Sequence, residues 1–250
     1  GLTGRDFVPV EISGKHFKEV KIASAIYHAD CILAVSHFKG HEATGFGGAL
    51  KNVGMGTGSR AGKQMMHSDV LPKVTGEKCR GCQKCLRWCP AQAIEIVDGK
   101  ASINPDLCLG CGECTVTCPH EAIKIRWRTT PESLQEKIVE FAWGALKDKK
   151  EKCAFINFVT GVTPFCDCTG WSDYPLVGDI GILASRDPVA VDQASYDLVL
   201  KESGLPGSRL GDKIGEADKF KAVHNIDGTI QLKYAEEIGL GSREYDLILV

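Results

Sequence analysis

The sequence lacks several features that would place it in common functional classes. It has no excess of basic residues, since 30 Lys and Arg stand against 32 Asp and Glu, whereas nucleic-acid-binding domains display a basic field. No apolar run approaches the ~18 residues of a membrane-spanning helix, and no secretory signal precedes the first predicted strand. We therefore expect a protein that binds neither nucleic acid nor a membrane.

Cysteine is abundant, and eight of the twelve cysteines form two copies of one pattern. The copies, offset by 29 residues, are Cys79, Cys82, Cys85 and Cys89, and Cys108, Cys111, Cys114 and Cys118. A proline follows the last cysteine of each copy, and the similarity continues beyond it, where Ala93-Ile94-Glu95-Ile96 is matched by Ala122-Ile123-Lys124-Ile125. The unit is internally duplicated.

This spacing is typical of ligands to cubane iron-sulfur clusters. Three thiolates separated by two-residue gaps can turn toward one centre, and in a duplicated CxxCxxCxxxCP unit the last cysteine of each copy serves the other cluster. The sequence therefore predicts two [4Fe-4S] clusters. Their ligands would be Cys79, Cys82, Cys85 and Cys118 for the first, and Cys108, Cys111, Cys114 and Cys89 for the second.

Two other uses of these cysteines compete with the clusters. Zinc sites also use CxxC pairs, but the pairs are usually further apart and a third cysteine would be surplus. A disulfide framework requires an oxidising compartment. Residues 73–128 resemble the bacterial-type two-cluster ferredoxins, which favours the clusters and, with them, a reducing cytoplasm.

Both flanks of the cysteine unit alternate predicted strands and helices. Short apolar runs, typical of buried parallel strands, occupy residues 31–36, 155–159, 178–184 and 247–250. The first run places Cys31 in the core. We predict an α/β domain, a mainly parallel sheet with flanking helices, over 1–72 and 129–250, interrupted by a small α+β ferredoxin-like insertion at 73–128. Three domains in series are the alternative.

A glycine-rich run at residues 36–63 follows the first buried strand. Ligands of open α/β sheets bind at the carboxyl ends of strands, and glycines let backbone N–H groups approach an anion closely. The positively charged candidates for this binding loop are Lys39, Lys51, Arg60 and Lys63. A glycine-rich connection with solvated lysines is the alternative.

Five further residues are candidates for a metal or proton-transfer site. They are His37, His41, His67, Cys166 and Cys168. In extended backbone, cysteines one residue apart point to the same face and can hold one metal together. The alternatives are ordinary surface or core histidines and a pair of reduced thiols in a loop.

The flanks carry a second resemblance. Ser36-His37-Phe38-Lys39-Gly40-His41, Cys166-Asp167-Cys168 and the segment 179–190 resemble the family called domain of unknown function 362. This resemblance implies an iron-sulfur protein with an embedded ferredoxin unit, and an N-terminal part that precedes Gly1, but no reaction.

We therefore expect an electron-transfer protein whose two clusters relay electrons to or from an unidentified redox partner or ligand at the α/β domain. The alternative is an oxidoreductase with its own metal or substrate site, for which the clusters are the internal relay. A non-redox enzyme with structural clusters is a third possibility. No catalytic residue follows from the sequence.

Overall fold

A three-stranded sheet brings the two flanks of the cysteine unit together. In the computed structural model, which describes residues 6–67, 71–108, 110–124, 129–168 and 170–250, β3 (Ile32–His37) pairs in parallel with β10 (Cys153–Val159). β10 also pairs antiparallel with β11 (Gly181–Ser185). The sheet is thus mixed. The other paired strands among the described residues are antiparallel, so the predicted mainly parallel sheet gives way to a mixed α/β arrangement of small sheets.

The remaining elements divide between the flanks and the cysteine unit. Before the unit lie β1 (Phe7–Glu11), β2 (Glu19–Ala23), α1 (Ser24–Tyr27), β4 (Lys39–His41), β5 (Gly45–Gly47), α2 (Ala49–Thr57) and α3 (Arg60–His67). Within it lie β6 (Lys73–Val74), α4 (Lys84–Trp88), β7 (Ile94–Val97), β8 (Lys100–Ile103), α5 (Glu113–Thr117) and β9 (Ile123–Lys124). After it lie α6 (Pro131–Leu146), α7 (Pro188–Lys201), α8 (Lys219–His224), α9 (Ile230–Glu237) and the 3-10 turns Lys150–Lys152 and Gly211–Lys213.

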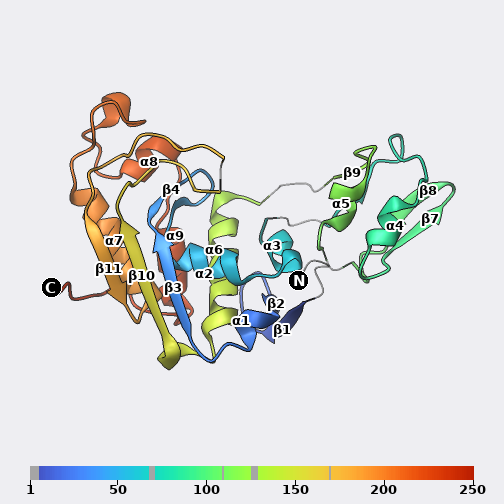
Figure 1. Ribbon diagram of the computed structural model, residues 1–250, viewed down its shortest axis with the longest axis horizontal. Helices are drawn as coiled ribbons and strands as arrows, with labels where there is room; N and C mark the ends of the chain where they lie inside the picture. Colours follow the sequence, from blue (N-terminus) through green and yellow to red (C-terminus); the bar gives the residue numbers. More distant parts are fainter. Residues whose placement is uncertain (1–5, 68–70, 109, 125–128, 169) are drawn as a thin grey trace.

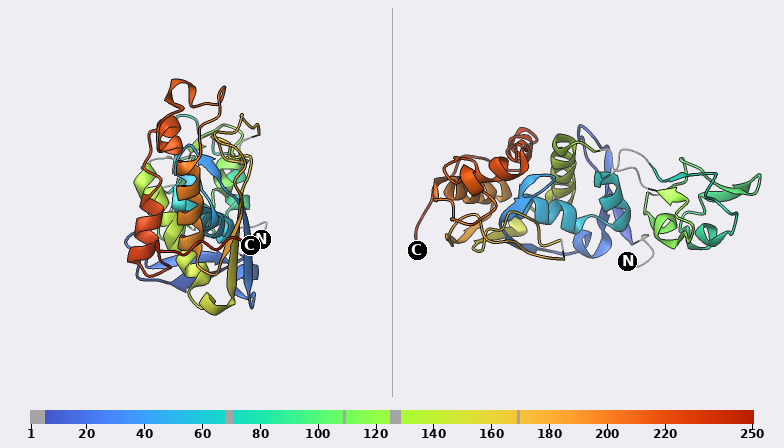
Figure 2. Two further views of the ribbon diagram at one scale, coloured as in Figure 1. Left: turned by 90° about the vertical axis from the view of Figure 1, so that its left-hand side faces the viewer. Right: turned by 90° about the horizontal axis from the view of Figure 1, so that it is seen from above.

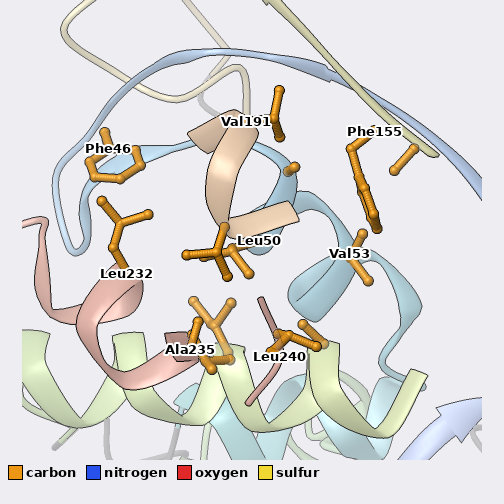
Figure 3. Packing of buried hydrophobic residues seen from close by; sticks show 14 of the residues in the cluster. Phe46, Leu50, Val53, Phe155, Val191, Leu232, Ala235 and Leu240 are labelled. Carbon is orange, nitrogen blue, oxygen red and sulfur yellow. The ribbon is translucent and has the colours of Figure 1, made fainter. Parts of the chain in front are cut away.

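One apolar core joins the two flanks. Figure 3 shows Leu50 and Val53 of α2 packed among Val191 of α7, Phe155 of β10 and Leu232 of α9, above α6. The side chains of Leu50, Phe155 and Leu232 are almost completely buried. Burial of one such side chain contributes about 1.5–3 kcal/mol, so α2 is held from several sides at once.

The opposite face of the sheet remains open. Leu33, Val35 and Ile182 are 63%, 53% and 61% exposed. Cys31, which the sequence placed in the core, is also exposed. The apolar runs therefore predicted the strands β3 and β11 but not their one-sided burial. The predicted closing strand at 247–250 is not paired, and its apolar side chains are exposed.

Helix starts follow their local sequence. The hydroxyl of Thr130 accepts a hydrogen bond from Ser133 N–H, and Pro131 occupies the first turn of α6. At the start of α7, the carboxylate of Asp187 accepts hydrogen bonds from the N–H groups of Val189 and Ala190, and Pro188 follows Asp187 in the first turn. These caps satisfy N–H groups that have no partner inside the helix, which is why both starts were predictable.

The cysteine unit has its own buried cluster and lies at one end of the molecule (Figures 1 and 2). Its β7–β8 hairpin turns through Asp98 and Gly99, both with positive φ, as the sequence predicted. The boundary predicted at residue 128 lies outside the described residues, and the division into domains stays a prediction. Among the helices described, none is long and apolar enough to cross a bilayer.

Candidate metal centres

The eight cysteines of the duplicated unit line two cavities. Cys79, Cys82, Cys85 and Cys118 line the first. Cys108, Cys111, Cys114 and Cys89 line the second. Each cavity therefore combines three cysteines of one copy with the last cysteine of the other, and apolar side chains such as Ile123 and Ile94 complete the walls.

The backbone repeats with the sequence. Residues with positive φ occur at matching positions of the two copies, in the pairs Gly81 and Gly110, Gln83 and Gly112, and Gln92 and Glu121. Helices α4 and α5 follow at equivalent places and bury Cys85 and Cys114. Because the left-handed residues bend both loops in the same way, each loop turns its first three cysteines toward one cavity.

Backbone N–H groups point at several of these sulfurs. Ala101 donates to Cys79 Sγ, Ala93 to Cys89 Sγ and Ala122 to Cys118 Sγ, each at 3.3 Å. The bond from Ala101 is the main reason that the pKa of Cys79 is lowered. Such donors favour thiolates, and hydrogen bonds to cluster sulfurs are a known means of tuning a cluster's potential.

Burial acts in the opposite direction on the innermost sulfurs. Burial, together with the nearby Cys108 and Cys111, raises the pKa of Cys114 to about 12. Burial likewise raises the pKa of Cys85, Cys108 and Cys111. In the second cavity, Cys108 and Cys111 raise the pKa of Cys114, and Cys111 raises that of Cys108, so these sulfurs gain from a cationic centre.

The distances between the sulfurs distinguish a site for a cluster from a site for a single ion. Among the described residues, His41, Cys166 and Cys168 are the group whose three donor atoms all lie within 4.8 Å of one another. The cysteines of the two cavities are spread more widely. Four sulfurs around one zinc ion, at about 2.3 Å from it, would lie about 3.8 Å apart, so the quartets fit a larger polynuclear group better.

His41, Cys166 and Cys168 meet although they are far apart in sequence. His41 ends β4, and the cysteines lie in the segment that follows β10. A Cβ on Gly40 would lie 2.1 Å from the carbonyl oxygen of Pro164, and Gly40 N–H donates to Thr163 O at 2.8 Å. Glycine at position 40 therefore allows β4 to approach the cysteine segment closely.

Burial and the charges around this trio lower the pKa of His41 and shift the pKa values of the two thiols in opposite directions. Burial, reinforced by Lys51, lowers the pKa of His41 to about 3. Burial alone would raise the pKa of Cys166, but hydrogen bonds from Lys51 and from the backbone of Cys168 bring it below its usual value. Lys51 Nζ lies 3.0 Å from Cys166 Sγ. Burial and the neighbouring Cys166 raise the pKa of Cys168.

The other two predicted histidines are not members of the trio. His37 Nδ1 contacts Asp167 Oδ2 at 2.9 Å, and its Nε2 lies 3.0 Å from Thr160 O. His67 ends α3, where burial and Lys51 lower its pKa. A histidine that the sequence did not single out, His224, lies close enough to His41 to influence its pKa, and its Nε2 contacts Pro164 O at 2.6 Å. Only the fold brings His224 there.

Three of the four predicted anion-binding residues line one open cavity of about 360 Å³. They are Lys39, Lys51 and Lys63, joined by His37, Asn52 and Asp167. Arg60 does not line this cavity; it forms an ion pair with Glu113 of α5. The run at 36–63 is not a loop either, since it forms β4, β5, α2 and α3.

The start of α2 is occupied by a carboxylate from the same chain. Asp192, completely buried, accepts from Ala49 N–H at 2.6 Å, from Leu50 N–H at 2.9 Å and from Asn157 Nδ2 at 2.7 Å. Burial raises its pKa to about 6. The N–H groups that the glycine-rich run was expected to offer to a ligand are thus used internally, and the lysine side chains are what the cavity presents to an anion.

Comparison with known proteins gives a family but no activity. No curated protein matches the chain at a significant level. The model of one family, described as domain of unknown function (DUF362), matches residues 1–197. That match covers more than half of the 250 residues and includes the cysteine unit, β3, β10, β11 and the trio of His41, Cys166 and Cys168. The chain therefore belongs to the DUF362 family.

Proposed function

We propose that this protein transfers electrons through two [4Fe-4S] clusters held by its duplicated cysteine unit. The observation that supports the proposal best is the crossed composition of the two cavities. Cys118 lines the cavity of the first copy and Cys89 that of the second, as the duplicated motif requires. Because the copies exchange ligands, the two centres are neighbours, and single electrons can pass between them.

The chain contributes a dry, sulfur-rich setting for this chemistry. The clusters would supply the one-electron redox change. Apolar walls such as Ile94 and Ile123 limit the access of water, and the N–H groups of Ala93, Ala101 and Ala122 orient and stabilise the sulfur ligands. Thiolate ligands persist in reducing surroundings, so we place the protein in the cytoplasm.

Anaerobic chemical analysis tests the proposal directly. The full chain, isolated and reconstituted without oxygen, should contain about eight irons and eight acid-labile sulfides. C31S is a matched control, because Cys31 is exposed and lines neither cavity. A wild-type content below about four irons would overturn the two-cluster assignment, whereas an unchanged content in C31S shows that loss of a thiol outside the duplicated unit does not by itself remove iron.

The cavity lined by Lys39, Lys51 and Lys63, the lysine cavity, favours a second candidate function, an oxidoreductase with its own ligand site. Lys39 Nζ lies 3.2 Å from Asp167 Oδ2, and Lys51 Nζ contacts Cys166 Sγ, so two of the cavity's charges border the CxC segment. A small anionic substrate held by the lysines would lie beside these sulfurs, and the clusters would carry electrons to or from it.

Binding of inorganic phosphate, as a simple anionic probe, tests this second function. K63Q should weaken phosphate binding several-fold, and added salt should weaken it in the wild type, because the lysine cavity is open to solvent. K201Q, at the end of α7 and outside the cavity, is the matched control. Equal binding by wild type, K63Q and K201Q would remove the cavity as the anion site.

A further inference from the structure

We propose that His41, Cys166 and Cys168 bind one thiophilic divalent metal ion of the Zn²⁺ class, separate from the clusters, with a fourth position open to an exogenous ligand. The three donor atoms already lie within 4.8 Å of one another. This site is independent of the proposed electron transfer, since none of the three residues lines a cavity of the duplicated unit.

The donor set and its spacing match zinc. Zinc binds thiolates at about 2.3 Å and imidazole at about 2.0–2.1 Å in tetrahedral geometry, which puts the donors about 3.5–3.8 Å apart. The donor atoms of the trio, which lie within 4.8 Å of one another, need to approach by at most about 1.3 Å to reach this geometry. Two sulfurs with one imidazole are a soft donor set, which disfavours Mg²⁺ and Ca²⁺.

The protein holds the three donors in place before any ion binds. Gly40 N–H to Thr163 O, at 2.8 Å, fastens β4 to the segment that leads into the cysteines. Ala43 N–H donates to His41 Nδ1 at 3.0 Å, a bond that occupies the single lone pair of the neutral imidazole and is exchanged for the ion when His41 binds it. His41 and Cys166 are buried while Cys168 is exposed. The pair of buried donors therefore forms the floor of the site, and the exposed sulfur lies at its mouth.

Lys51 gives the site a net preference for an anionic fourth ligand. Two thiolates and a neutral imidazole around a divalent ion carry no net charge, and the ammonium of Lys51, 3.0 Å from Cys166 Sγ, adds one positive charge. Lys51 also lines the cavity that Lys39 and Lys63 border. Sites with three protein ligands keep a position for water or substrate. A small carboxylate or phosphate is the ligand chemistry that this position and cavity fit.

Zinc content measured together with iron content tests the site. The reconstituted full chain is incubated anaerobically with Zn²⁺, desalted, and analysed for both metals by mass spectrometry. Wild type and the C31S control should retain about one zinc per chain. C168S should retain at least tenfold less, since loss of one of three ligands weakens binding strongly. Because Cys168 is exposed, this variant leaves the core intact, and H41Q supplies an independent second variant.

X-ray absorption at the zinc edge reports the ligands without interference from iron. Two sulfurs and two nitrogen or oxygen neighbours are expected. Four sulfur neighbours would place the zinc on the duplicated cysteines and overturn the proposal, as would zinc retention by C168S and H41Q equal to that of the wild type, or no retention by the wild type. The iron content, measured in the same samples, tests the cluster assignment separately, so either proposal can fail alone.

Discussion

At the scale of single residues, Asp192 is the buried charge on which the core depends most directly. It binds both N–H groups at the start of α2 and the amide of Asn157, and it is completely enclosed. It joins α7, which carries it, to α2 and β10. An ionised carboxylate in such a place is tolerable only because three donors point at it.

D192N should destabilise the protein by about 1–3 kcal/mol at pH 7. An amide supplies only one acceptor oxygen, so its NH₂ group would face an N–H of Ala49 or Leu50 and leave it without a partner. Chemical denaturation followed by far-UV circular dichroism measures the loss. D212N is the control, because Asp212 is exposed; equal stability of wild type, D192N and D212N would contradict this role.

The same residue should make stability depend on pH in a defined direction. The pKa of Asp192 is raised from 3.8 to about 6 by burial. Between these values the native state binds more protons than the unfolded state, so the free energy of unfolding falls as pH rises. The advantage of wild type over D192N should therefore be larger at pH 5 than at pH 7.5, by on the order of 1–2 kcal/mol. An advantage that grows with pH would reverse the assigned sign.

Residue roles were predictable from sequence only where they depend on near neighbours. The first three cysteines of each copy line one cavity because short loops separate them, whereas their assignment as cluster ligands stays a prediction. Arg60 was grouped with Lys39 by sequence proximity, but α3 carries it to Glu113 instead. Asp192 and His224 carry no local signal, since their partners lie far along the chain.

At the scale of elements, the duplicated unit makes a sharp prediction about which cysteines act together. If the ligands cross as the cavities are lined, C79S/C118S removes two ligands of one cluster and should lower the iron content from about eight to about four. C108S/C118S removes one ligand from each and should lose most of the iron. Iron and sulfide analysis of the two purified double variants distinguishes them.

The reciprocal pair is the matched control for this comparison. C89S/C108S should keep about four irons, and C79S/C89S should lose most of them. An uncrossed arrangement, in which each copy holds one cluster by itself, predicts the reverse order for all four variants. Iron analysis of the four variants distinguishes the crossed from the uncrossed arrangement. Each variant lacks two thiols, so the number of lost sulfurs does not differ among them.

Strands and helices were predictable to the extent that local sequence determines them. The caps at Thr130 and Asp187 and the Asp98-Gly99 turn act within a few residues, and the structure confirms them. The antiparallel pairing of β11 with β10 and the exposure of the sheet face that carries Leu33 depend on which strands pair and what covers them. An apolar run in the sequence does not determine either. The glycines that suggested a loop serve close packing instead: a Cβ on Gly54 would lie 2.1 Å from Ile138 O of α6.

At the scale of the whole molecule, the two parts of the chain meet through charges near the second cavity. Arg60 of α3 forms an ion pair with Glu113, which begins α5 and lines that cavity. Arg60 and Lys21 both act on the sulfur of Cys111. Neither residue is among the influences on the pKa of Cys79 or Cys85 in the first cavity. The α/β part of the chain therefore acts electrostatically on the second cavity more than on the first.

R60Q and E113Q should consequently shift the potential of one cluster in opposite directions. Reduction adds negative charge to a cluster, so loss of the Arg60 charge should lower the potential of the second cluster, and loss of the Glu113 charge should raise it, each by tens of millivolts as an order of magnitude. Redox titration followed by electron paramagnetic resonance measures both centres in one sample. K84Q, beside the first cavity, should move the other centre downward. Shifts of the same sign in R60Q and E113Q would indicate that the ion pair acts by holding the two parts of the chain together rather than through its charges.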